Sequence, residues 1–154
     1  MAEVDYLNVA YPNEDAIKEV IRKFESCEYA PAEFTHARHL TVGCWYLCTL
    51  SADEALDRMR THLQNFSAHH GKQGYHETIT RFWIKLLDAA IQHQHEDLPI
   101  LGRINAVVGL YPKEVLFDYY TRERVMSDQA KREWVEPDLR EIGGTEQPLQ
   151  STAG

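Results

Sequence analysis

The sequence predicts an all-α protein, and three observations carry this prediction. Apolar residues recur at helical spacing in four long segments. Several of these segments begin at good helix-capping residues. No stretch of alternating apolar and polar residues competes as a strand. Because the loops between the helices are short, we expect an antiparallel up-down helical bundle of four main helices with a C-terminal helical extension and a disordered tail.

The first two helices differ in how far they are expected to be buried. Residues 13–29 predict an amphipathic helix that begins at Asn13 and carries acidic residues in its first turn. A second helix over residues 31–48 opens with a proline, which is tolerated in the first turn. After residue 33 its only formally charged side chain is Arg38. A helix that is apolar on nearly all sides belongs at the centre of the fold.

The later helices follow the same rules. A capping box formed by Ser51 and Glu54 opens the third helix, which stops at Gly71. The remaining predicted segments are the fourth helix over residues 75–94, a shorter helix over 98–110, and C-terminal helical segments over 112–120 and 127–135.

Length and charge restrict the domain organisation and the partners. The chain has 154 residues, which fits one domain over residues 1–136 followed by a flexible polar tail over residues 137–154. Its 24 acidic and 16 basic residues give a net charge of −8, which argues against nucleic acid or an anionic membrane surface as partner. Three cysteines are too few for a disulfide framework, and neither a signal peptide nor a membrane-spanning run is visible. We therefore expect a cytoplasmic protein.

The sequence contains eight histidines, and their placement is more informative than their number. His36 and His39 lie about 60° apart on the second helix and point into the same buried sector. His76 begins the apolar stripe of the fourth helix, where the helix dipole favours a neutral ring. In an up-down bundle these three residues share one end, and His62 lies about two turns deeper.

Histidines that converge from separate helices are typical ligands of a divalent transition metal. The sequence therefore predicts a site for Zn, Fe, Ni or Cu held by His36, His39 and His76, with His62 or His70 as a further ligand. An open coordination position would support hydrolysis, hydration or oxygen chemistry on a small molecule.

Other residues near the predicted site have two interpretations each. Glu77 is placed to act as a base or to orient a ligand, or else to pair with Arg81 one turn later. Tyr75 and Trp83 would form aromatic walls for a bound cofactor or substrate, or simply belong to the core. Cys44 lies about 12 Å along the helix from His36, too far to share a metal with it, and is best interpreted as a buried thiol.

The alternative hypothesis is a non-enzymatic module that binds a small ligand, or a second copy of the chain, and whose histidines are hydrogen-bonded core groups. The two hypotheses predict different geometries. Metal ligands must converge on a common ion about 2.0–2.1 Å away. Core histidines would instead bond to separate backbone carbonyls.

Overall fold

The computed structural model describes residues 10–94 and 97–142, and in these ranges it confirms an all-α protein. About two thirds of the described residues are helical, and these residues form no strand. The elements are α2 (Glu14–Glu25), η1 (Pro31–Glu33), α3 (His36–Thr49), α4 (Ala52–His69), α5 (Glu77–Gln92), α6 (Ile100–Val108), η2 (Lys113–Val115), α7 (Leu116–Tyr119), α8 (Arg122–Val125) and α9 (Asp128–Arg132). None of the helices in the described part is long and apolar enough to cross a membrane.

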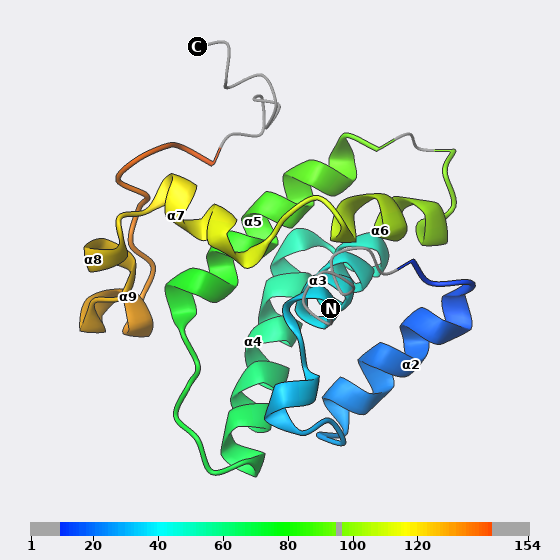
Figure 1. The fold of residues 1–154 in the computed structure, drawn as a ribbon, viewed down its shortest axis with the longest axis horizontal. Helices are drawn as coiled ribbons and strands as arrows, with labels where there is room; N and C mark the ends of the chain where they lie inside the picture. Colours follow the sequence, from blue (N-terminus) through cyan, green and yellow to red (C-terminus); the bar gives the residue numbers. More distant parts are fainter. Residues whose placement is uncertain (1–9, 95–96, 143–154) are drawn as a thin grey trace.

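Helix α3 lies at the centre of the molecule, as its apolar sequence predicts (Figure 1). It packs against α2, α4, α5 and α6. Leu40 and Val42, which point in nearly opposite directions around its axis, are both buried. The arrangement of the main helices as an antiparallel up-down bundle stays a prediction.

Gly43 allows α3 and α5 to approach closely. A Cβ atom at this position would lie 2.9 Å from Cδ1 of Leu87, closer than two carbon atoms pack. It would also come within 4 Å of Met59 and Ile84. The absence of a side chain therefore brings the central helix into contact with its main neighbour.

The helix starts follow the predicted capping residues. The Asn13 side chain accepts a hydrogen bond from Ala16 N at 2.9 Å, and Ser51 and Glu54 form the reciprocal capping box. Helix α2, however, ends at Glu25 and not near residue 29. The chain turns there because Cys27 adopts a left-handed conformation with φ of 62°.

The predicted second helix is divided in two. Pro31 opens a single 3-10 turn, and α3 begins only after Thr35, whose side chain caps it by accepting from Arg38 N at 3.4 Å. Phe34, between the two pieces, is turned into the core. His36 is consequently the first residue of α3.

The C-terminal segments pack on α5, mainly through α9. The predicted flexible tail begins at residue 137, but Asp138 accepts hydrogen bonds from the backbone and the hydroxyl of Thr121 at 2.8 and 2.7 Å. Leu139 N donates to Tyr119 O at 2.9 Å. The rest of the predicted tail, residues 143–154, lies outside the described residues, and the division at residue 136 stays a prediction.

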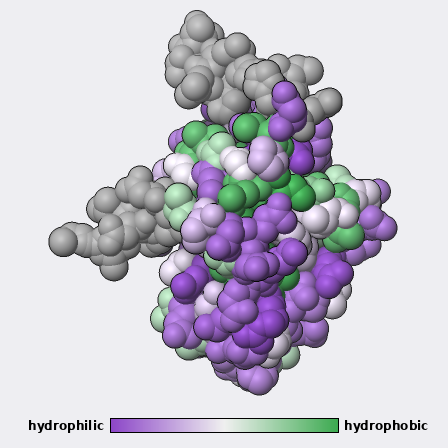
Figure 2. All heavy atoms as spheres, turned by 90° about the vertical axis from the view of Figure 1, so that its right-hand side faces the viewer, coloured by the Kyte–Doolittle hydropathy of each residue, from purple (hydrophilic) through white to green (hydrophobic). Residues whose placement is uncertain are grey.

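The face at the right of Figure 1 is mostly polar in its lower part, whereas apolar residues gather nearer its upper middle (Figure 2). Exposed large apolar side chains elsewhere are scattered along the described chain: Leu98, Leu110, Met126 and Leu139.

Candidate functional site

Two of the three predicted metal ligands bind backbone carbonyls. Nε2 of His36 donates to Tyr111 O at 2.8 Å, and its ring lies edge-on to Trp83 at 5.0 Å. Nε2 of His76 donates to Val125 O at 2.8 Å, and its Nδ1 accepts from Ile79 N at 3.1 Å. Both rings are thus committed to structural hydrogen bonds, each toward a different element.

The prediction of a metal-binding protein is therefore wrong for the part of the chain that the structure describes. There, no group of three or more His, Cys, Asp or Glu side chains could hold a metal ion. His36, His39, His76 and His62 are not brought together as ligands. The physical reason at His76 is that α5 begins at Glu77 and not at residue 75, so the His76 ring caps the helix and does not begin its buried stripe.

His62 belongs to a separate polar cluster on α2, α3 and α4. Its Nε2 lies 3.7 Å from a carboxylate oxygen of Glu25, and its Nδ1 is buried without a partner among the described residues. Glu25 also accepts from Tyr46 OH at 2.5 Å and Arg58 Nε at 3.1 Å. Burial raises the pKa of Glu25, but the hydrogen bonds from Arg58 and Tyr46 outweigh it and lower the pKa overall. This carboxylate ties three helices together.

Glu77, considered above as a base, is held in a two-pronged ion pair with Arg60, at 3.0 Å from Nε and 2.6 Å from Nη2. Tyr75 OH also donates to it at 2.6 Å. The hydrogen bond from Arg60 lowers the pKa of Glu77, which keeps its carboxylate charged. Its predicted partner Arg81 instead stacks over the ring of Trp134 at 5.2 Å.

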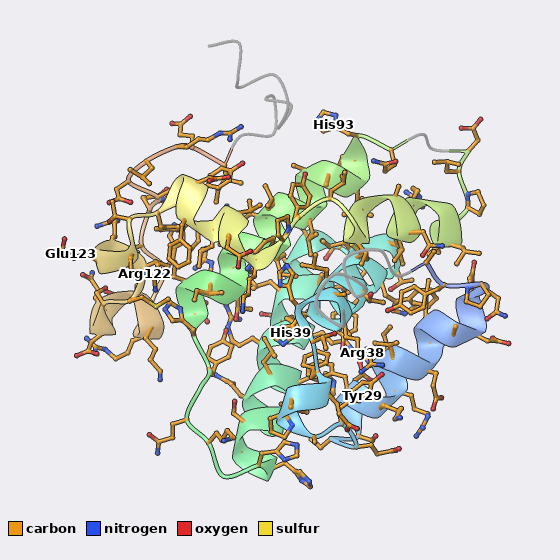
Figure 3. The ribbon with its side chains drawn as sticks, in the orientation of Figure 1. Tyr29, Arg38, His39, His93, Arg122 and Glu123 are labelled. Atoms are coloured by element: carbon orange, nitrogen blue, oxygen red, sulfur yellow. The ribbon has the colours of Figure 1, made fainter. Side chains whose placement is uncertain are left out.

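His39 differs from the other inward-facing histidines. Its ring stacks on Phe34 with centroids 4.0 Å apart, while Phe24 stacks on Phe34 at 4.4 Å. Because both rings lie nearly parallel to Phe34 and close to it, they must occupy its opposite faces. In Figure 3, His39 lies in the middle of the molecule, whereas Arg38 is directed toward Tyr29.

The ring nitrogens of His39 have no hydrogen-bond partner among the described residues. Neither is sealed from solvent, since the fully enclosed unpartnered atoms of the described part lie on other residues. Burial, and secondarily the nearby His36, lowers the pKa of His39 to about 4. The imidazole is therefore neutral at pH 7 and offers one N–H donor and one nitrogen acceptor.

These nitrogens are accessible because His39 lines a cavity of about 280 Å³ between α3, α4 and α5. Besides His39, the lining residues are Pro31, Leu63, Phe66, Ser67 and His70 on one side and Lys72, Gly74, Tyr75, His76, Ile79 and Thr80 on the other. The carbon-rich walls and the three histidine rings make this cavity a candidate ligand site.

A smaller, inner hollow of about 40 Å³ shares part of its lining with the cavity. His39, Leu63 and Thr80 line both spaces, so the His39 ring lies at their junction. The inner hollow adds only apolar and aromatic residues to the lining: Leu40, Met59, Trp83, Ile84 and Leu87. A molecule that occupied both spaces would thus meet the polar ring of His39 between them.

Most other polar atoms on the lining are already used. Nε2 of His70 donates to Tyr29 O at 3.0 Å, and the Thr80 hydroxyl donates to His76 O at 2.8 Å. Tyr75 presents its ring to the cavity while Glu77 holds its hydroxyl. Ser67, His39 and, at the mouth, Lys72 keep side-chain polar atoms that have no partner among the described residues.

The sequence identified part of this lining for another reason. His39, His70, His76, Tyr75 and Trp83 all line the two spaces, although the described residues form no group of three or more possible metal ligands. Sequence reasoning missed Lys72, because the loop that contains it was interpreted only as a helix stop and a turn. The signal that could have identified Lys72 is its position in the loop between α4 and α5, the two helices that form walls of the cavity.

Comparison with models of protein families, with curated proteins and with solved structures gives no match to this chain. Any function must therefore be argued from the geometry of the site.

Proposed function

We propose that the protein binds a small organic molecule in the cavity between α3, α4 and α5. The molecule has an apolar body and a polar group that hydrogen-bonds to His39. The observation that carries this proposal is the pair of unpartnered ring nitrogens of His39 in an otherwise apolar cavity. A hydrogen bond from a ligand to such a ring nitrogen contributes about 0.5–1.5 kcal/mol.

The volume limits the ligand to a small one. An apolar cavity of about 150 Å³ is enough to hold benzene, and pockets for drug-sized ligands begin at about 300 Å³. At about 280 Å³ the cavity suits a single ring or a short branched chain with one polar substituent. The inner hollow of about 40 Å³ leaves room for only one or two further atoms.

The test uses three monocyclic probes of equal chain length and different charge: phenylacetamide, phenylacetate and phenethylamine. With nine or ten non-hydrogen atoms and about 0.4 kcal/mol per atom, a binding probe has a Kd of about 1–2 mM. Two-dimensional ¹H–¹⁵N NMR of the labelled protein measures which amide signals shift. We expect saturable shifts at residues on the cavity walls for at least one probe.

Ser67→Leu supplies a matched control, because Ser67 lines the cavity from α4. The leucine side chain fills part of the space and should abolish the shifts. Ala68→Leu makes a similar change at the next, exposed position of the same helix and should leave them intact. Absence of cavity shifts with all three probes, or equal shifts in both variants, contradicts the proposal.

A further inference from the structure

The charges around the cavity point to the chemical class of its ligand. We infer, on the basis of the proposed function, that the ligand is a small monocarboxylate. Its carboxylate accepts a hydrogen bond from His39 and pairs with Lys72, and its apolar body fills the rest of the cavity.

Lys72 lies at the mouth of the cavity. It follows Gly71, whose φ of 68° reverses the chain after α4. Its side chain is exposed and lines the cavity, and its ammonium group has no partner among the described residues. The same loop attracts a second cation, since Nζ of Lys131 donates to Gln73 O at 2.6 Å.

No acidic side chain lines either space in the described part of the molecule. This is notable in a chain with a net charge of −8. The acid next to the lining, Glu77, is directed to Arg60, which neutralises it. The polar groups that a ligand meets in the described part thus include the cation Lys72 and the neutral imidazole of His39 but no carboxylate, and such a lining favours an anion over a cation.

A carboxylate has the chemistry to bind both groups. It accepts hydrogen bonds at each of its oxygens, so one can take the N–H of His39 and the other the ammonium of Lys72. An amide of the same shape can accept from His39 but gains little from the lysine. An ammonium ion would be repelled by Lys72.

Phenylacetate and phenylacetamide are nearly isosteric and separate charge from shape. We expect phenylacetate to bind two- to fivefold more tightly than phenylacetamide, the range for a partly exposed ion pair. Lys72→Gln should remove this preference, and added salt should reduce it in the wild type. Lys85→Gln, at an exposed lysine that does not line the cavity, is the matched control and should preserve it.

A second readout is the titration of the His39 ring, followed by the NMR signal of its C2 proton. A carboxylate bound beside the ring stabilises the imidazolium, so saturating phenylacetate should raise its midpoint, and phenylacetamide should not.

The outcomes distinguish the two proposals. Equal or tighter binding of phenylacetamide or phenethylamine, or an unchanged preference in Lys72→Gln, overturns the carboxylate inference and leaves the proposed ligand site standing. Failure of all three probes to bind overturns both.

Discussion

Replacing His39 with phenylalanine should change how the stability of the protein depends on pH. The substitution keeps a flat ring against Phe34 and removes the titrating group. The ordinary pKa of histidine is 6.5, and burial lowers that of His39 to about 4. Between these two values the unfolded chain binds a proton at this position that the folded chain does not, so folding becomes less favourable as the pH falls through 6.5.

The magnitude follows from the two pKa values. A difference of about 2.5 pH units corresponds to about 3.4 kcal/mol in full, of which about 2 kcal/mol is already lost at pH 5 and about 3 kcal/mol at pH 4. Because the His39 side chain is partly exposed, these figures are upper bounds. The pKa values of His36 and His76 are also lowered by burial, so the wild type loses stability at these positions too.

The assay is urea unfolding of wild type and His39→Phe, followed by far-ultraviolet circular dichroism at pH 7, 6 and 5. The contributions of His36 and His76 are common to both proteins and cancel in the comparison. We expect the free energy of unfolding of the wild type to fall by up to about 2 kcal/mol more than that of the variant between pH 7 and pH 5. Parallel pH profiles would refute the reasoning.

Three further predictions concern stability at pH 7, each measured by urea unfolding. His76→Ala should lower the free energy of unfolding by about 2 kcal/mol, because it removes the cap of α5 and the hydrogen bond to Val125. His76→Asn keeps the cap and should restore about half of this loss. Equal losses in the two variants would contradict the capping role. Gly43→Ala should change the free energy of unfolding by less than about 1 kcal/mol, since the flexible tip of Leu87 can move into the inner hollow. Gly43→Leu should lower it by about 3 kcal/mol. Similar effects of the two substitutions would contradict the close approach of α3 and α5. Cys27→Gly should stabilise by about 0.5–1 kcal/mol because glycine adopts a φ of 62° without strain, and a loss of stability would be the contrary result.

The fold class and the central position of α3 could be predicted because both follow from local apolar patterns. A helix with one charge after its first turn has few places other than the centre of the fold. The capping residues Asn13 and Ser51 were equally predictable, since each acts on backbone atoms two or three residues away.

The candidate site was only partly predictable, because its chemistry depends on the residue at which α5 begins and on distant segments. His76 lies at the N-cap and not within α5, and that single step changes its ring from a candidate ligand into a capping group. Its Nε2 and that of His36 bind carbonyls of Val125 and Tyr111, which are 49 and 75 residues away in the chain. Helical periodicity carries no information about such partners. It indicates which side of a helix a ring lies on, but not whether the ring binds a metal or a backbone carbonyl.

The bonds between α5 and the C-terminal segment make the cavity and that segment thermodynamically linked. Thr78, on α5, donates to Glu133 O at 2.7 Å, and Lys131 holds the loop at the cavity mouth through Gln73 O. His76, on the cavity wall, holds Val125 O. Local opening of α8 and α9 would therefore release the wall and the mouth together. By reciprocity, occupation of the cavity should slow amide hydrogen exchange in segments that the ligand never touches.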